Sequence, residues 1–341
     1  MNGFLRNAWY MAAWAEEVPE GGLLARQLLG QDWVIWRKGD GQWAMLADRC
    51  PHRFAPLSKG RRVGDTLRCG YHGLGYDATG ACVHNPFGQA VPPGMTVPAM
   101  ALVERHSGLW FWPGDPALAD PAAIPDFSFV DEPHHVRVAL VMDVDYRLIV
   151  DNLMDLTHVE FMHIETFGVN GSMLDHGRQT VVTEEDGAIW NNWAVENVPP
   201  PQWAEALLQP GQRIDQWINI RWHAPASMAL HVGLAVAGTD HAAMVVPAMV
   251  NPHILTPASD TRTHYFCSHG PEEGARALMD EVFLNEDEPM MRAVQERMGG
   301  ADFWALRPAI LPSDAAAIRV RRRMQQLAGM EQRQGPATVT G

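Results

Sequence analysis

Two short segments near the N-terminus each carry one cysteine and one histidine, and this repeated pairing constrains the fold more than any other feature. The first segment is CPH, Cys50–His52, and the second is CGYH, Cys69–His72, after a spacer of sixteen residues. Each segment offers one thiolate and one imidazole, which are ligands of both zinc and iron. We therefore expect two short turns that present four metal ligands within one small domain.

Ligand chemistry alone leaves two kinds of centre open. A four-coordinate zinc ion accepts two Cys and two His, although such sites commonly carry a CxxC pair, which these segments lack. A Rieske [2Fe–2S] centre needs two Cys on one iron and two His on the other, which a Cys/His pair from each of two loops supplies. Pro51 stiffens the first loop, and Gly70 and Gly73 allow backbone amides to approach the cluster sulfurs.

The first third of the chain is dense in short strand signals broken by turn residues. Trp33–Trp36 and Trp43–Leu46 flank a Gly-Asp-Gly turn, a pattern that predicts a hairpin, and Leu109–Trp112 predicts a further strand. Four prolines between residues 113 and 125 mark a connecting segment. We expect an all-β domain over residues 1–120.

The rest of the chain predicts a second domain over residues 121–330 and a flexible tail over 331–341. Strand patterns follow one another from Thr180 to Cys267 without intervening helices, which predicts an antiparallel sheet. Helical patterns flank these strands at Tyr146–Thr157, Glu272–Met298 and Ser313–Leu327. The expected fold class is therefore α+β, with an all-β domain followed by a sheet with flanking helices.

The charge balance excludes some classes of partner. The chain has 40 acidic residues against 26 Lys and Arg, a formal net charge of −14, which disfavours nonspecific binding to nucleic acid or to an anionic membrane. No stretch approaches the ~20 apolar residues of a membrane span, and no apolar leader precedes Glu16. Four cysteines are too few for a disulfide framework. We expect a cytoplasmic protein.

A second constellation follows the predicted helix, in the segment DNLMDLTHVEFMH. His158 and His163 would lie about 140° apart on one continuous helix, too far round to share an ion, so the helix must end or bend between them. Asp155, three residues before His158, shares its face, and its carboxylate could orient that imidazole or relay a proton or electron. Two His and one carboxylate suit a non-haem Fe(II) oxygenase site. A satisfied pair at a helix end is the alternative interpretation.

These motifs together resemble those of Rieske non-haem iron oxygenases. The resemblance is carried by CPHRFAPLS from Cys50, CGYHGLGYD from Cys69 and the DNLMDLTHVEFMH segment, and it extends over nearly the whole chain. It is closest to the oxygenase components of vanillate and dicamba O-demethylases. The family fold that it implies has a Rieske domain followed by a catalytic mononuclear iron domain.

The resemblance also implies roles for individual residues. It assigns the [2Fe–2S] cluster to Cys50, His52, Cys69 and His72. It assigns the mononuclear Fe(II) to His158, His163 and, from the late acidic segment FLNEDEPMM, Asp287, with Glu286 and Asp280 as rival third ligands. Asp155 would be the bridge toward the cluster, and Asn152 would lie near the iron. Pro289 should kink or restart the helix near Asp287.

The activity implied is O-demethylation of a methoxylated, vanillate-like aromatic acid to the phenol and formaldehyde, using O2. Electrons from NAD(P)H would come through a separate reductase carrying flavin and an iron–sulfur centre, or a ferredoxin, because no GxGxxG fingerprint follows a strand here. Another Rieske reaction (N-demethylation, methyl hydroxylation or ring hydroxylation) and a Rieske electron carrier without oxygen chemistry are the alternatives.

Three further features complete the expectations. The family assembles as head-to-tail trimers, so we expect a homotrimer in which Asp155 faces the cluster of a neighbour. The strand residues His231 and His253 are candidate substrate ligands, with Arg221 as a further positive donor. The run Arg319–Arg323 is either a solvated helix face or a docking surface for an acidic electron donor.

Overall fold

The structure is a computed structural model that describes residues 3–88, 90–168, 171–240 and 244–334. The chain divides into two compact units. The first unit is built on Met1–Asp126 and also includes Thr256–Asp260, and the second consists of Phe127–Leu255 and Thr261–Arg333. Each unit is described by itself.

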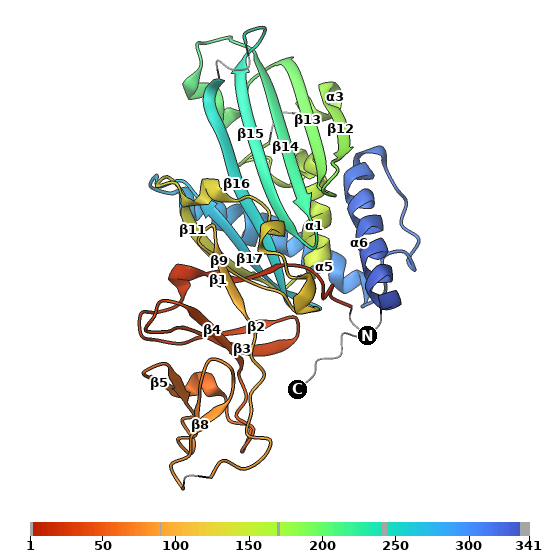
Figure 1. The fold of residues 1–341 in the computed structure, drawn as a ribbon. Coiled ribbons are helices and arrows are strands. Elements are labelled where there is room, and N and C mark those ends of the chain that lie inside the picture. Colours follow the sequence, from red (N-terminus) through yellow and green to blue (C-terminus); the bar gives the residue numbers. More distant parts are fainter. Residues whose placement is uncertain (1–2, 89, 169–170, 241–243, 335–341) are drawn as a thin grey trace. The chain divides into compact units, whose positions relative to one another are not determined.

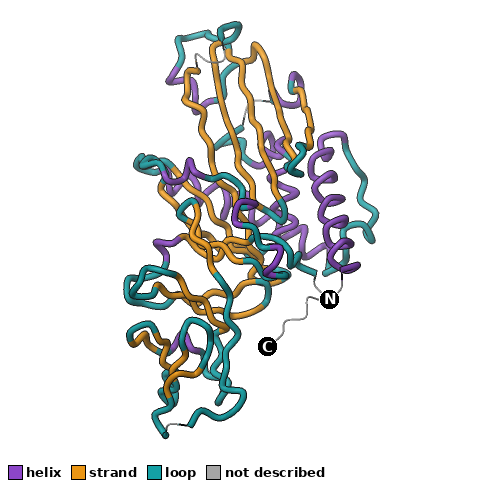
Figure 2. Tube along the Cα trace, viewed as in Figure 1, coloured by secondary structure: helices purple, strands orange, loops and turns teal. Residues whose placement is uncertain are grey.

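The first unit contains three small antiparallel sheets and only short helical turns (Figures 1 and 2). In spatial order the strands are β1 (Tyr10–Trp14), β10 (Gly108–Phe111) and β9 (Leu102–Arg105); β2 (Leu24–Leu28), β3 (Gln31–Arg37) and β4 (Trp43–Ala47); and β5 (Arg61–Val63), β6 (Thr66–Arg68), β7 (Gly75–Tyr76) and β8 (Cys82–His84). The 3-10 turns are η1 (Ala15–Glu17), η2 (Leu57–Lys59), η3 (Pro116–Leu118) and η4 (Pro121–Ala123). The predicted hairpin is confirmed, since β3 pairs with β4.

Buried aromatic residues form the core of this unit. Trp14, Trp36 and Trp110 are almost completely buried. The return segment Thr256–Asp260 joins the same unit because backbone amides of the β2–β3 turn donate to the carbonyls of Pro257 (2.8 Å) and Ala258 (2.7 Å). The domain boundary expected from the sequence put this segment in the second domain, because pairing between residues so far apart leaves no local pattern.

The second unit is built on a seven-stranded sheet in the order β11-β17-β16-β15-β14-β13-β12 (Figure 1). Its strands are β11 (Val136–Met142), β12 (Arg178–Thr183), β13 (Ile189–Val198), β14 (Ile214–His223), β15 (Ser227–Val236), β16 (Met244–Ser259) and β17 (Arg262–His269). Neighbours from β12 to β16 pair antiparallel, as do β11 and β17. The expected antiparallel sheet is confirmed, and with it the α+β class.

The α-helices of the described chain all begin in this unit. They are α1 (Tyr146–Met154), α2 (Val159–Met162), α3 (Ser172–His176), α4 (Ala275–Asp280), α5 (Glu288–Met298) and α6 (Ala315–Gln334). The 3-10 turns are η5 (Ser128–Asp131), η6 (Leu156–His158), η7 (Gln202–Leu207) and η9 (Pro312–Asp314), and η8 (Glu281–Asp287) is a π-helical segment. Of the tail expected over 331–341, residues 331–334 are the last turn of α6, and 335–341 lie outside the described residues.

No helix in the described ranges is long and apolar enough to span a membrane.

Candidate metal centres

The two Cys/His segments of the first unit fold into loops of the same conformation. In each loop the cysteine amide donates to the carbonyl five residues on (2.9 and 2.8 Å), and the cysteine carbonyl accepts from the amide four residues on (2.8 and 3.0 Å). That fourth position has a positive φ in both loops, at Phe54 (61°) and Gly73 (76°). Glycine adopts this conformation without strain, whereas a residue with a side chain does not. The first loop therefore holds Phe54 in a strained backbone conformation.

The four side chains are arranged as a two-metal cluster requires. Cys50 and Cys69 are buried, His52 is exposed, and the imidazole rings of His52 and His72 lie 4.6 Å apart. The Nδ1 atom of His72 is buried without a hydrogen-bond partner in the described chain, as expected of an atom reserved for a metal. The Tyr76 hydroxyl lies 3.3 Å from the Cys50 sulfur. Burial raises the pKa of the Cys69 thiol, so a stable thiolate there needs a bound cation.

Zinc fits this centre less well than a cluster of two irons. A zinc ion at about 2.0–2.3 Å from each ligand would draw all four ligand atoms around one point. Within the described residues, three or more such atoms converge on a single point only in the second unit, at His158, His163 and Asp287. The Cys/His set therefore fits a [2Fe–2S] cluster, in which thiolates and imidazoles hold different irons.

The second centre begins where α1 ends. Asp155 leaves the helical conformation (φ −112°, ψ 91°), so α1 stops three residues earlier than predicted. The Asp155 carboxylate accepts from the Thr157 amide (3.1 Å) and hydroxyl (2.6 Å), while its backbone carbonyl accepts from Nδ1 of His158. The expectation that the carboxylate itself orients His158 is thus corrected, because the carbonyl holds the ring and the carboxylate caps the next turn.

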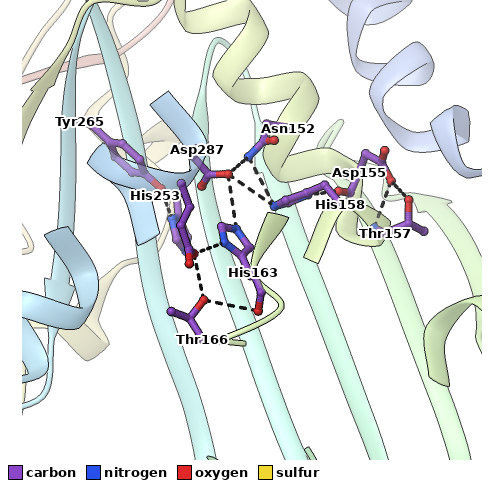
Figure 3. A network of polar contacts seen from close by, with 10 residues as sticks. Asn152, Asp155, Thr157, His158, His163, Thr166, His253, Tyr265 and Asp287 are labelled. Atoms are coloured by element: carbon purple, nitrogen blue, oxygen red, sulfur yellow. Dashed lines mark hydrogen bonds and ion pairs between the residues drawn. The ribbon is translucent and has the colours of Figure 1, made fainter. Parts of the chain in front are cut away.

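His163 directly follows α2 and lies outside the helix, as the 140° argument required. The rings of His158 and His163 are 5.1 Å apart. Oδ1 of Asp287 lies 3.3 Å from Nε2 of His163 and 3.9 Å from Nε2 of His158. Figure 3 shows the three side chains pointing toward one another. Two imidazole nitrogens and one carboxylate oxygen, all within 4.8 Å of one another, suit one Fe(II) ion with open positions.

Asp287 reaches this cluster from the π-helical segment η8, where the predicted long helix is interrupted. Asp287 is 2% exposed. Pro289 lies in the first turn of α5, where its missing amide costs no hydrogen bond, and the helix restarts there as expected.

The neighbouring Glu286, considered above as a rival iron ligand, also faces the centre, but it contacts a ligand ring instead. Its carboxylate accepts from Nδ1 of His163 (2.6 Å) and from the Thr166 hydroxyl (2.9 Å). Two consecutive carboxylates therefore contact opposite nitrogens of one imidazole, Glu286 at Nδ1 and Asp287 at Nε2. Asp280, the other rival ligand, instead pairs with Arg276 at the surface. The adjacency of Glu286 to Asp287 was the only available signal, because a π-turn has no readable sequence pattern.

Asn152, in the last turn of α1, lies against the ligand atoms. Its amide donates to Oδ1 of Asp287 (3.1 Å) and lies 3.4 Å from Nε2 of His158. A cavity of about 420 Å³ opens beside it, lined by Asn152, Asp155 and His158 and by apolar side chains such as Met290 and Phe303.

Two arginines of the run Arg319–Arg323 on α6 contact other parts of the second unit. The run is therefore not simply solvated, and not all of it is available for docking. Arg321 forms a salt bridge with Asp151 on the cavity wall, with its guanidinium 3.9 Å from the centre of the Phe303 ring. Arg319 donates to a backbone carbonyl of β12 (3.1 Å). Burial raises the pKa of Asp151 to about 6, although Arg321 opposes the shift. These two arginines therefore fasten α6 to α1 and to the sheet edge.

The two candidate substrate histidines lie on opposite faces of the sheet. His253 pairs across the strands with Met228, and His231 pairs with Asn219. Residues three apart on β15 point to opposite faces, so His231 and Met228 diverge. His231 instead lies beside Trp190 (ring centroids 5.3 Å) on the face that carries Arg221. The expectation that His231, His253 and Arg221 share one pocket does not hold.

His253 is the histidine close to the metal ligands. Its ring lies 5.8 Å from that of Phe283, which belongs to the same π-helical segment as Asp287. The Asp287 carboxylate acts electrostatically on His253, which is 3% exposed.

Comparison with known proteins agrees with both centres. Residues 8–96 match the Rieske [2Fe–2S] domain, and residues 142–330 match the vanillate O-demethylase oxygenase C-terminal domain. The chain is 37% identical to the oxygenase component of chloroacetanilide N-alkylformylase from Rhizorhabdus wittichii, over 94% of this chain and 95% of that protein. It is 36% identical to the oxygenase component of dicamba O-demethylase from Stenotrophomonas maltophilia, over 96% and 99%.

A solved structure agrees as well. Dicamba monooxygenase bound to 3,6-dichlorosalicylic acid superposes with a TM-score of 0.86 at 36% identity, covering 96% of this chain and 99% of that one. The cofactors are accordingly a Rieske [2Fe–2S] cluster and a mononuclear non-haem iron. The chain belongs to the Rieske oxygenases, as an oxygenase component with the vanillate O-demethylase type of catalytic domain.

Proposed function

We propose that this chain O-demethylates a methoxylated aromatic acid, giving the phenol and formaldehyde. The observation that carries the proposal is the convergence of His158, His163 and Asp287 beside Asn152 in a catalytic domain of the vanillate O-demethylase type. Hydroxylation of an aryl methoxy carbon gives a hemiacetal, which breaks down to these two products. A relative that covers nearly the whole chain is named for the same reaction on dicamba.

We assign the cofactors to specific side chains. Cys50 and Cys69 would hold one iron of the cluster, and His52 and His72 would hold the other. Nε2 of His158, Nε2 of His163 and a carboxylate oxygen of Asp287 would hold the mononuclear iron. When bound, the cluster supplies electrons, and the ferrous ion activates dioxygen for attack on the substrate.

The neighbouring residues have distinct tasks in this proposal. Asn152 restrains the Asp287 carboxylate through its amide, and the Asp155 carbonyl and Glu286 carboxylate fix the two imidazole rings. Each imidazole is thereby held at Nδ1, which leaves Nε2 for the metal. His253 would receive the polar group of the substrate.

We also propose a homotrimer in which electrons cross between subunits near Asp155. Three apolar side chains around the Cys/His loops are largely exposed, namely Phe54 (63%), Tyr71 (65%) and Phe87 (74%). The apolar cavity beside Asp155 likewise has exposed walls, including Met290 and Leu306. Clustered apolar exposure marks interfaces, and a ring of three identical head-to-tail contacts would cover both surfaces. Light scattering of the purified protein measures the number of subunits.

A separate electron donor completes the proposed system. The relatives are named as oxygenase components, so their reactions require further proteins. We propose a reductase with flavin and an iron–sulfur centre, or a ferredoxin, as the donor.

The test is formaldehyde release from a panel of methoxybenzoates that includes vanillate and dicamba, with a surrogate reductase. Release of formaldehyde and phenol in equal amounts, dependent on added iron, is expected. O-demethylation would be contradicted if no methoxyarene in the panel released formaldehyde and a cis-diol formed instead.

A second candidate reaction is N-dealkylation of a neutral anilide. It is favoured by the likeness to the Rhizorhabdus wittichii protein, whose name includes chloroacetanilide. Including an N-alkyl chloroacetanilide in the panel distinguishes the two reactions by which substrate is dealkylated.

A further inference from the structure

The wall beside the proposed iron site contains a buried histidine–tyrosine pair. Nδ1 of His253 lies 2.5 Å from the hydroxyl of Tyr265, and both side chains are almost fully buried, at 3% and 1% exposure (Figure 3). The other ring nitrogen, Nε2 of His253, is buried and has no hydrogen-bond partner in the described part of the chain. The imidazole of His253 is thus hydrogen-bonded at Nδ1, while its Nε2 has no partner in the described part of the chain.

Counting donors and acceptors indicates where the imidazole proton lies. The Tyr265 hydroxyl has one polar contact among the described residues, the contact with His253. If Nδ1 carried the proton and donated to the hydroxyl oxygen, the buried hydroxyl proton would have no acceptor. If the hydroxyl donates to Nδ1, its proton is satisfied, and the imidazole proton lies on Nε2. In the free protein each arrangement leaves one buried donor unsatisfied, the hydroxyl proton in the first and the Nε2 proton in the second. An oxygen acceptor placed at Nε2 satisfies the last donor only in the second arrangement, which is then favoured by about 1–3 kcal/mol.

The surroundings make this nitrogen an uncharged donor. Met228 faces His253 across the strands, and the Phe283 ring packs against both members of the pair (5.8 and 5.0 Å). Burial lowers the pKa of His253 to about 4, despite the opposing effect of Asp287. The Arg221 charge acts instead on His223 and His231.

No cationic side chain among the described groups acts on His253. The chain has two lysines, Lys38 and Lys59, and both belong to the first unit. Among the described groups, Asp287 is the one whose charge acts on His253. A substrate group placed against His253 therefore meets an N–H donor rather than a fixed positive charge.

We infer that Tyr265 is a positioning residue that holds the imidazole proton of His253 on Nε2 when a substrate binds, so that His253 donates to an oxygen acceptor of the substrate without requiring that acceptor to be charged. The inference rests on the proposed function only in taking His253 as the substrate contact. It extends the substrate class from aromatic acids to the amides of the same ring. The Nε2 proton, unsatisfied in the free protein, is satisfied by a carboxylate or carbonyl oxygen.

The first test measures binding without turnover. 3-Methoxybenzoate and 3-methoxybenzamide are titrated calorimetrically into the anaerobic, iron-loaded protein. The two dissociation constants are expected to agree within about tenfold, because a neutral donor adds little charge preference. Tyr265→Phe should weaken both by about tenfold, with iron content and circular dichroism unchanged. Binding of the acid more than about a hundredfold tighter than the amide, or no binding of either, would overturn the inference.

A matched pair at position 253 separates positioning from packing. His253→Gln can place an amide N–H near the position of Nε2, whereas His253→Asn places its amide nearer Nδ1. The Gln variant should bind both probes within about threefold of the unmodified protein, and the Asn variant about tenfold more weakly.

The double variant tests the link between the two residues. In the His253→Gln background, Tyr265→Phe should have less than about a threefold effect, because the amide needs no tautomer to be set. An equal effect of Tyr265→Phe in both backgrounds would show a merely structural role. Failure of formaldehyde release in the substrate panel leaves these binding differences intact, so the proposed reaction and this inference can fail separately.

Discussion

The two metal centres draw their ligands from very different lengths of chain. The Cys/His set lies between Cys50 and His72, on two loops with the same backbone hydrogen bonds. The His/His/Asp set joins the segment after α1 to η8, with contacts such as Asn152 to Asp287 that span 135 residues. The first centre is therefore fixed by local loop conformation, and the second by the packing of distant elements.

The difference also extends to what surrounds the ligands. Backbone amides and glycine positions shape the first centre, whereas side-chain contacts shape the second. The Glu286–His163 and Asn152–Asp287 hydrogen bonds both join η8 to residues of the segment that contains α1 and α2. We therefore expect loss of one ligand to remove the whole cluster from the first centre. Substitutions around the second centre should lower its iron affinity by amounts that differ from residue to residue.

The largest effects should come from removing a ligand in each centre. Cys69→Ala should lose both irons of the cluster and its visible absorption, because no other buried thiolate can replace the lost one. Asp287→Ala should lose only the mononuclear iron, leaving two of three irons per chain and the cluster spectrum intact. Metal analysis with absorption spectroscopy measures both. Loss of the cluster signal on Asp287→Ala would break the distinction between the centres.

Asp155→Asn tests the connection between the centres. Asn keeps an oxygen for Thr157 and leaves the backbone carbonyl to His158, so both metals should remain bound. Turnover should fall by about a hundredfold because the carboxylate charge is lost. Replacing a group next to the metal ligands commonly has an effect of this size. Iron content and steady-state formaldehyde release are measured together. Activity close to that of the unmodified protein would argue against Asp155 as the bridge.

Glu286 should act in a graded manner. Glu286→Ala removes the acceptor of His163 and should weaken Fe(II) affinity by about 10- to 100-fold, while Glu286→Gln, which still accepts, should lose less. Competition with a chelator measures the affinity. Asp280→Asn is the matched control, since that carboxylate pairs with Arg276 at the surface. Equal losses for Glu286→Ala and Asp280→Asn would mean that Glu286 is not part of the centre.

The smallest effect is a pH dependence of stability from His253. Its pKa is about 4 in the folded protein against 6.5 ordinarily, so between these values the unfolded chain binds a proton that the folded chain does not. This contribution is present above pH 6.5 and is lost as the pH falls, by about 2 kcal/mol at pH 5. Denaturant unfolding of the iron-loaded protein and of His253→Gln at pH 7 and pH 5 measures it. A constant difference between the two proteins would contradict the assignment.

Much of the second centre was readable because its two histidines follow one helix end. The 140° argument required the helix to end between His158 and His163, and α2 ends at Met162. Pro289 correctly marked the restart of the late helix. Glu286 was expected only as a rival iron ligand, and its contact with Nδ1 of His163 was not predicted, because the extra residue of a π-turn changes which side chains face inward without altering the hydrophobic pattern. His231 was misplaced because its face depends on strand register, which a pattern of apolar residues left undecided.

The amino-acid sequence by itself determined the α+β class, the first-unit loops and the ligand types, since these depend on local spacing and side-chain chemistry. The tertiary structure decided which carboxylates meet His163, which histidine stands beside the iron site, and that Thr256–Asp260 returns to the first unit. The physical reason is distance along the chain. Contacts between residues more than a hundred positions apart arise from packing and register, which local patterns do not encode.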